Sequence, residues 1–289
     1  MYDNKRLGNT LRELRINRHM SLKEAAGADM SLSQLSRFER GESDISLCKF
    51  LSVIDRLQIE VKEFMDAAMD YQKTEHIKLM SSLIELEYER DIKGFKRLQD
   101  EERKKLEEDP QNIRRRLNII LLQGFVCKCD ESVEFPKEYL DEVTDYLFHT
   151  ENWNIYELIL IGNLYLFIDI PLLHEMGKEI VKRKKFYKEI GTHKNLVIIT
   201  LMNIWEVCIH KDELETALFY QKEVYKLIEN ETRLYEKTIY LFLTGLCAYK
   251  QKDVLGGIED MKNAIGIFEM LGCINMAKNY KNDFEKYVK

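Results

Sequence analysis

Apolar side chains recur at three- and four-residue spacing along almost the whole chain, which is the pattern of helices that bury one face. No segment shows a convincing alternation of period two, as a half-buried strand would. Only three prolines interrupt the pattern, at positions 110, 136 and 171. The sequence therefore predicts an all-α fold.

The first 66 residues divide into short helices. Leu7, Leu11 and Leu14 form the apolar stripe of a first helix, and Ser21 can cap a second. Ser31 has the spacing of a capping box with the residue three places later, Gln34, and so starts a third helix. Gly41 is well placed to end that helix, because glycine accepts the left-handed conformation, and residues 45–57 form a further helix.

A short helix, a tight turn and a helix with a polar outer face make a helix-turn-helix pattern. The outer face of the second of these helices carries Ser33, Gln34 and Arg37. Such a helix suits the major groove, because its N-terminal side chains reach base edges and its backbone N–H groups point at phosphate.

From about residue 75 onward, helical patterns alternate with short polar breaks, in units of roughly 35–40 residues that suit tetratricopeptide-like repeats. The clearest unit, 238–271, has Gly245, Gly257 and Ala264 where such repeats need small residues. We therefore expect a helix-turn-helix domain over 1–66, a linker over 67–74 and a helical-repeat domain over 75–289.

Three amide side chains interrupt apolar helices of this second domain at a constant interval of 40 residues: Gln123, Asn163 and Asn203. In a stack of helix pairs, the first helix of each pair lines the concave face. The amides would then form a ladder that suits the backbone of an extended peptide. The competing interpretation is structural, with each amide satisfied by a neighbouring helix or carbonyl.

Other side chains are candidates for the same groove. Tyr156 lies two helical turns before Asn163, and Leu166 and Trp205 are close to the amides along the chain. The basic runs at 113–117 and 181–188 could bind a peptide carboxylate, but we interpret them as solvated helix faces.

Charge and composition narrow the class of protein. The whole chain of 289 residues carries a net charge of −6, yet residues 1–40 hold eight Lys/Arg against five Asp/Glu. The basic footprint of a DNA-binding domain is therefore segregated into the first domain. No secretory signal or membrane-spanning segment is expected, and the six scattered cysteines fit a reducing cytoplasm.

No enzyme motif is visible. The chain has no glycine-rich phosphate loop, no zinc-protease motif and no nucleophile elbow, and its six histidines are scattered. The pair "CKC" at 127–129 is only a weak metal or redox signal, because no histidine or second cysteine pair accompanies it. We expect no catalytic residue, no metal and no cofactor.

The segment "SLSQLSRFERGES" (31–43) resembles the recognition helix and following turn of Xre-type helix-turn-helix domains, and is most similar to those of Rgg-type (Rgg/GadR/MutR) regulators of Gram-positive bacteria. The resemblance implies that Arg15 and Glu39 form a structural pair. It also implies that six further side chains contact DNA. Ser33, Gln34 and Arg37 would contact bases, and Arg12, Ser21 and Arg40 would contact phosphates.

The segments "ENWNIYELILIGN" (151–163) and "LYEKTIYLF" (234–242) resemble Rgg-type proteins too, and the similarity extends over essentially the whole chain. The resemblance implies a repeat domain that binds a short hydrophobic signalling peptide, as in quorum sensing, with concave-face asparagines on the peptide backbone. Relatives can carry a basic residue where this chain has Leu166, which implies a more apolar peptide. The resemblance to Rgg-type proteins also implies that the C-terminal helices form the dimer interface.

The resulting hypothesis is a cytoplasmic, homodimeric regulator that binds promoter DNA and a peptide pheromone. Two alternatives stay open: a repressor-like regulator whose repeats bind a protein partner, and a helical-repeat sensor phosphatase.

Overall fold

The computed structural model describes residues 3–72, 74–183 and 191–288, and within these residues it contains α-helices and no strand. The predicted all-α fold is confirmed. The chain divides into two compact units, residues 1–82 and 83–289, and the division falls within one helix. None of the described helices is long and apolar enough to cross a membrane.

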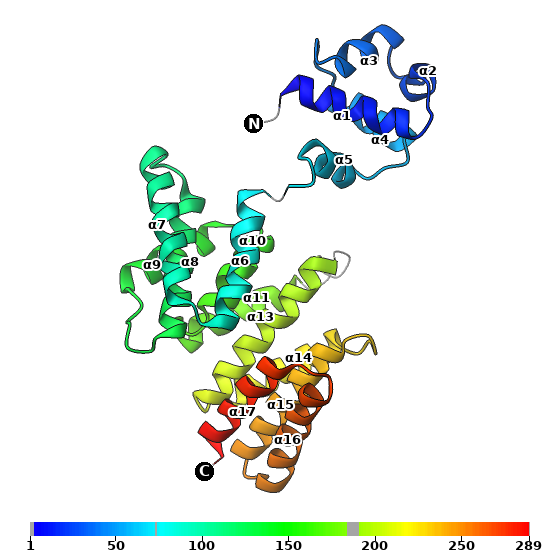
Figure 1. Cartoon of the computed structure of the whole chain (residues 1–289). Helices are drawn as coiled ribbons and strands as arrows, with labels where there is room; N and C mark the ends of the chain where they lie inside the picture. The colour runs from blue at the N-terminus through cyan, green and yellow to red at the C-terminus, as the bar shows by residue number, and fades with distance from the viewer. Residues whose placement is uncertain (1–2, 73, 184–190, 289) are drawn as a thin grey trace. The chain divides into compact units, whose positions relative to one another are not determined.

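The first unit is built from five short helices and the start of a sixth (Figure 1). In chain order these are α1 (Asn4–Asn17), α2 (Leu22–Ala26), α3 (Leu32–Glu39), α4 (Leu47–Arg56), α5 (Val61–Ala68) and α6 (Glu75–Glu89).

The core of the first unit comes from the apolar stripes of these helices. Leu11, Leu35 and Val53 are completely buried, and Phe38 is nearly so. Leu7, Leu14 and Leu22 pack against this core from its edge. The predicted apolar stripe of the first helix is confirmed, and α5 adds Phe64 to the same core.

Local signals set the ends of these helices. The Ser21 side chain accepts a hydrogen bond from the backbone N–H of Glu24, whose carboxylate accepts one from the Ser21 N–H in return. Ser31 caps α3 by accepting from the Gln34 N–H, but the Gln34 side chain does not reciprocate, so the expected capping box is only half formed. Gly41 ends α3 with a φ of 73°.

The second unit follows as helix pairs (Figure 1). Its described helices after α6 are α7 (Ile92–Glu108), α8 (Ile113–Cys129), α9 (Lys137–His149), α10 (Ile155–Leu164), α11 (Ile170–Lys182), α13 (Gly191–His210), α14 (Leu214–Leu227), α15 (Leu234–Lys250), α16 (Val254–Met270) and α17 (Ile274–Tyr287).

Four helices of the second unit, which we call the inner helices, lie side by side: α8 packs against α10, α10 against α13, and α13 against α15. The pair α15–α16 packs tightly because a Cβ at Gly257 would lie 2.5 Å from the Gly245 carbonyl oxygen. Ala264 is completely buried. The tetratricopeptide-like arrangement expected from these small residues is confirmed.

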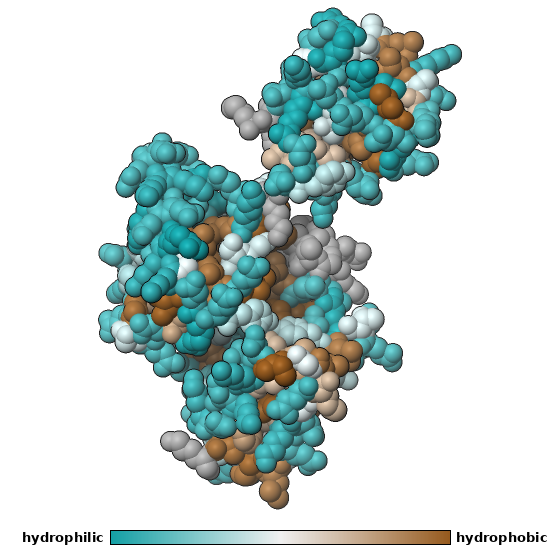
Figure 2. Space-filling view, viewed as in Figure 1, coloured by the Kyte–Doolittle hydropathy of each residue, from teal (hydrophilic) through white to brown (hydrophobic). Residues whose placement is uncertain are grey.

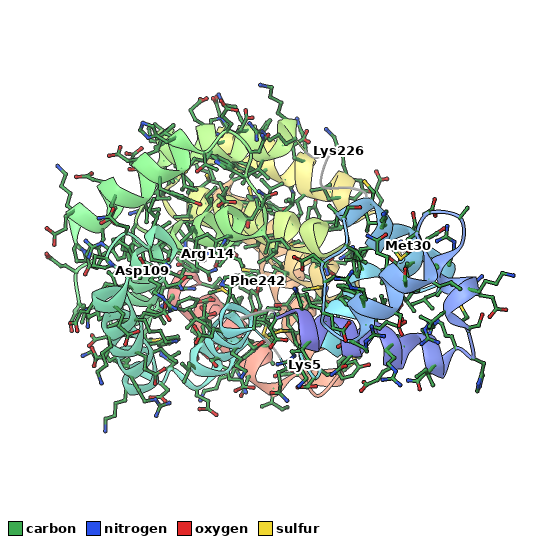
Figure 3. All side chains as sticks on the ribbon, turned by 90° about the horizontal axis from the view of Figure 1, so that it is seen from above. Lys5, Met30, Asp109, Arg114, Lys226 and Phe242 are labelled. Carbon is green, nitrogen blue, oxygen red and sulfur yellow. The ribbon has the colours of Figure 1, made fainter. Side chains whose placement is uncertain are left out.

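The C-terminal helix α17 lies across the last helix pair and reaches α13 (Figure 1). Phe242 in the middle of α15 is buried inside this unit (Figure 3), and its ring centroid lies 4.7 Å from that of Tyr280 on α17. At the other end of α17, the Tyr287 hydroxyl lies 3.3 Å from Nδ1 of His210 on α13. These contacts bring α17 next to the inner helices.

Candidate functional site

Helix α3 presents a polar face that runs from its first turn to its last. Ser33 and Arg37 are exposed, and the described residues offer Arg37 neither a hydrogen bond nor an ion pair. Gln34 is half-buried, and its Oε1 accepts a hydrogen bond of 2.8 Å from Lys49 Nζ on α4. Of the three candidate base-contacting side chains, Arg37 is therefore the one whose donors are all available to DNA.

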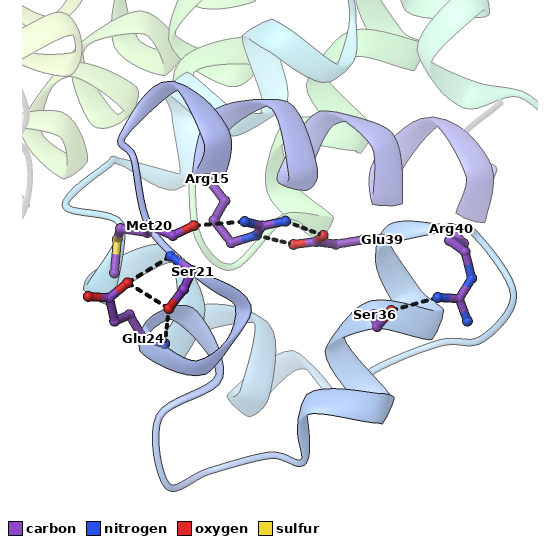
Figure 4. A network of polar contacts seen from close by, with 7 residues as sticks. All are labelled: Arg15, Met20, Ser21, Glu24, Ser36, Glu39 and Arg40. Atoms are coloured by element: carbon purple, nitrogen blue, oxygen red, sulfur yellow. Dashed lines mark hydrogen bonds and ion pairs between the residues drawn. The ribbon is translucent and has the colours of Figure 1, made fainter.

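The three candidate phosphate contacts differ in the same way. Arg12 on α1 is exposed and has no polar partner within the described part of the chain. Ser21 is engaged in the capping interaction with Glu24, and Arg40 donates to Glu42 at 2.7 and 2.8 Å and to Ser36 (Figure 4). Arg40 would have to exchange these partners to contact DNA.

Arg15 and Glu39 form a buried, bidentate ion pair, with N–O distances of 2.7 and 2.8 Å (Figure 4). Arg15 also donates to the Met20 carbonyl at 2.7 Å. The hydrogen bonds that Arg15 donates to Glu39 are the main cause of the raised pKa of Arg15. The pair joins α1 to the end of α3 and leaves neither side chain available to read a base.

A cavity of about 390 Å³ lies in the second unit between inner helices and α17. Asn163 on α10 and Asn203 on α13 both line it. The remaining lining residues are Glu87, Lys128, Leu158, Ile159, Gly162, Tyr165, Leu196, Ile199, Thr200, Glu206, Met276, Asn279, Tyr280 and Asp283. Apolar side chains and two amides therefore share one hollow.

The two asparagines bind carbonyls through their amide nitrogens. Asn203 Nδ2 donates to the Gly162 carbonyl at 2.8 Å, which links α13 to α10. Asn163 Nδ2 donates to the Ile159 carbonyl of its own helix at 2.8 Å. Neither Oδ1 accepts a hydrogen bond from a described residue. The amide nitrogens are thus satisfied within the fold, as the structural interpretation expects, whereas the amide oxygens are available to a ligand.

The third amide lies elsewhere. Gln123 on α8 accepts from Gln99 Nε2 at 3.2 Å, and its Nε2 lies 3.6 Å from Cys127 Sγ. Gln123 does not line the cavity, so the structure brings two of the three expected amides to one hollow. Tertiary contact with α7 turns this side chain away from the other two.

Three further predicted groove residues do not line the cavity either. The Tyr156 hydroxyl donates to Asn118 Oδ1 at 2.8 Å, and Arg114 covers its ring at 3.9 Å. Trp205 is completely buried, because a residue two places after Asn203 points to the opposite side of α13. Leu166 is 43% exposed and lies beyond the end of α10. The structure therefore does not bring these three side chains to the hollow that Asn163 and Asn203 line.

Four charged side chains of the lining were missed at the sequence level: Glu87, Lys128, Glu206 and Asp283. Glu206 follows Asn203 by three residues, so helical spacing alone places it on the same face. Burial, and then the charge of Asp283, raise the pKa of Glu206 to about 7. Burial also raises the pKa of Asp283.

The basic run at 113–117 is bound within the fold. Arg116 pairs with Glu142 at 2.9 Å and Arg115 with Glu102 at 3.4 Å. In the second run, Arg183 pairs with Glu179 on the same helix, and residues 184–188 lie outside the described residues. The described parts of both runs behave as ordinary ion-paired helix faces.

A second hollow, of about 610 Å³, lies among α14, α15 and α16. Its lining is mainly apolar, and includes Tyr225, Leu234, Tyr240 and Leu241 but no side-chain amide. The part of the chain that the structure describes contains no group of three or more metal-ligating side chains. Burial raises the pKa of the Cys127 and Cys129 thiols, so they are poor metal ligands at neutral pH.

Comparisons with known proteins place this architecture. A family model described as "HTH-type transcriptional regulator Rgg, C-terminal domain" matches residues 96–282. The crystal structure of the SHP pheromone receptor Rgg2 of Streptococcus dysgalactiae is 30% identical, with a TM-score of 0.78, and the match covers 98% of this chain and 100% of that chain.

A cysteine-to-serine variant of the same receptor gives 29% identity and a TM-score of 0.79, with 98% and 100% covered. The PrgX/cCF10 complex is 14% identical with a TM-score of 0.68, with 98% of this chain and 92% of that chain covered, and so shares the fold. The match to the receptor extends over both units of this chain.

Proposed function

The chain belongs to the Rgg family of HTH-type transcriptional regulators, and we propose that a short hydrophobic signalling peptide controls it. The cavity beside Asn163 and Asn203 is the proposed peptide site. The observation that carries the proposal is the pairing of two amide acceptors with apolar walls in one hollow, in a chain that matches a pheromone receptor over 98% of its length.

The amide oxygens suit a peptide because each can accept a hydrogen bond from a backbone N–H. The apolar walls, formed by Leu158, Ile159 and Ile199, suit its side chains. Asn203 also couples peptide to protein, since its Nδ2 already holds α13 to α10 through the Gly162 carbonyl. A peptide that pulls on Asn203 would therefore change the contact between two repeats.

At the DNA end, Arg37 and Ser33 of α3 are proposed to read bases in the major groove. Gln34 would join them only if DNA displaces Lys49 from its side chain. Arg12 is proposed to contact a phosphate, where it would fix the register of the domain on the duplex. This assignment leaves Arg15 and Glu39 as the internal brace of the reading helix.

A homodimer is proposed to bring two such helices to one operator. Large apolar side chains are exposed at the C-terminal end of the second unit, over α16 and the turn to α17 (Figure 2). Leu255 is 83% exposed, Met270 81% and Ile274 65%. Exposed apolar side chains at both ends of α16 favour contact with a second copy of the chain.

Peptide and DNA would then act on each other through the dimer. Linkage requires that peptide change the affinity for DNA by the same factor as DNA changes the affinity for peptide. The family is one of regulators, and no residue group of the cavity forms a nucleophile and base pair. Regulation by peptide is therefore preferred to a phosphatase activity of the repeats.

Calorimetric titration tests the proposal. The purified protein is titrated with short hydrophobic peptides from the C-termini of small open reading frames beside its gene. We expect micromolar binding for one peptide, weakened about tenfold in Asn203→Ala, because one hydrogen bond of about 1.4 kcal/mol is worth that factor. Asn263→Ala is the matched control, since Asn263 is exposed on α16.

Absence of heat with every peptide, together with a merely lower melting temperature for Asn203→Ala, would contradict the proposal. The asparagines would then be structural, and the repeats would be left to bind a protein partner. Binding that Asn203→Ala leaves unchanged would move the peptide site to the hollow lined by Tyr225 and Leu241.

A further inference from the structure

One end of the cavity gathers two carboxylates and two phenols from three parts of the second unit. Glu206 comes from α13, Asp283 and Tyr280 from α17, and Tyr165 follows α10. All four side chains line the same cavity. Burial, and after it the charge of Glu206, raises the pKa of Tyr165 and of Tyr280. We call these four residues the acidic end of the cavity.

The two carboxylates of the acidic end have no partner in the fold. The described residues supply neither Glu206 nor Asp283 with a hydrogen bond or an ion pair. Lys128 is the one basic side chain among the described residues that line the cavity, and it pairs with Glu87. The cavity therefore keeps an excess of negative charge after its internal pairing.

Unpaired, half-buried carboxylates are costly, because partial removal from water disfavours their charged form. Burial, and then the charge of Asp283, accordingly raise the pKa of Glu206 to about 7. The charge of Lys128 on α8 lowers the pKa of Glu206 less than burial and Asp283 raise it. For Asp283, burial raises the pKa more than the charge of Lys286, on the same helix, lowers it. A cationic ligand group would remove the cost, whereas an uncharged peptide would increase it.

We propose that the peptide bound in this cavity carries a cation, either an N-terminal ammonium or a lysine or arginine side chain, which lies between Glu206 and Asp283. The inference rests on the proposed function and adds a charge requirement to it. Two carboxylates from different helices suit an organic cation, because both can accept charged hydrogen bonds from it. Two carboxylates are too few for a dedicated metal site.

The cation also explains how a largely apolar peptide binds in a single register relative to the cavity. Hydrogen bonds from Asn163 and Asn203 to a peptide backbone are the same at every residue, so they do not distinguish one register from the next. A single ion pair at the acidic end fixes which peptide residue lies there. Specificity would thus come from charge, and affinity from the apolar walls and amides.

The test uses short apolar peptides in which one lysine is scanned through the sequence, each matched by a glutamine peptide, and each with a free or an acetylated N-terminus. Calorimetry on the full chain should show one lysine position, or the free N-terminus, that improves the dissociation constant at least about tenfold over its neutral match. The lysine and acetylation series separate the two sources of the cation.

Two protein variants locate the effect. In Glu206→Gln and Asp283→Asn the advantage of the cationic peptide should fall to a few-fold or less, while binding of the neutral peptide is retained or improved. Glu259→Gln, an exposed position on α16, is the matched control and should keep the full advantage. Two separate variants are used so that misfolding of one leaves the other informative.

Proton counting gives a second readout that does not depend on any variant. A cation lowers the pKa of Glu206 from about 7, so the cationic peptide should release protons at pH 7, seen as heat that depends on the buffer's ionisation enthalpy. A neutral peptide should instead take protons up.

Peptides that bind through Asn203 with no preference for charge, and with proton uptake throughout, would overturn this inference and leave the proposed function standing. If no peptide binds at all, the proposed function fails together with it.

Discussion

Replacing Glu206 by glutamine should make the second unit more stable, and the gain should depend on pH. Glutamine keeps the shape of the side chain and removes its charge. The folded pKa of Glu206, about 7, lies above its ordinary value of 4.5, because burial and the charge of Asp283 disfavour the carboxylate. As pH rises, the unfolded chain loses this proton near 4.5, but the folded protein keeps it until about 7.

The sign of the effect follows from this order of proton loss. Between pH 4.5 and 7 the unfolded state binds fewer protons than the folded state, so stability falls as pH rises. The gap between 4.5 and about 7 corresponds to about 3 kcal/mol, at about 1.36 kcal/mol for each tenfold change in proton affinity. Part of the side chain faces the cavity, so about 2 kcal/mol is the expected gain of Glu206→Gln at pH 8.

The two tryptophans make the assay specific, because Trp153 and Trp205 both lie in the second unit. Urea unfolding of wild type and Glu206→Gln is followed by tryptophan fluorescence at pH 8 and at pH 5. We expect the variant to be more stable by about 2 kcal/mol at pH 8, with most of the difference gone at pH 5. Equal stability at pH 8, or a gain that does not change with pH, would refute the reasoning.

Three further substitutions test other parts of the structure. Glu39→Ala should lower the free energy of unfolding of the first unit by about 3–5 kcal/mol, measured by circular dichroism, because it leaves the buried Arg15 guanidinium uncompensated. Arg37→Ala should weaken operator binding by about 1–3 kcal/mol in a DNA titration, and equal loss on random DNA would make it a phosphate contact instead. Gly257→Ala should destabilise the last helix pair by about 1–3 kcal/mol in thermal unfolding, since its Cβ would meet the Gly245 carbonyl; an unchanged melting temperature would show that the helices can separate.

Features set by neighbours along the chain could be predicted from the sequence. The caps at Ser21 and Ser31 and the end of α3 at Gly41 depend on hydrogen bonds and backbone angles within a few residues. The exception is instructive: Gln34 has the spacing of a reciprocal cap, but Lys49 from another helix binds its side chain instead. A tertiary partner outcompeted a local one.

The cavity could be predicted only in part. A spacing of 40 residues places Asn163 and Asn203 on adjacent inner helices, and the structure brings both to one hollow. The same spacing fails for Gln123, because α7 supplies it with a closer partner. Asp283 could not be found from the pattern, since nothing local to α17 says that this helix returns to α13.

The leftover polar groups of the cavity share one chemical property. The amide nitrogens of Asn163 and Asn203 are used up on carbonyls, so these side chains offer acceptors, and the carboxylate of Asp283 offers acceptors too. The internal pairing that lowers the cost of burying two amides therefore also selects the ligand, which must supply donors. A peptide backbone supplies N–H groups to the amides, and a cationic group supplies charged donors where the carboxylates are. Both sets of residues then act as one site, because a ligand that satisfied only the amides would leave the half-buried charge of the acidic end uncompensated.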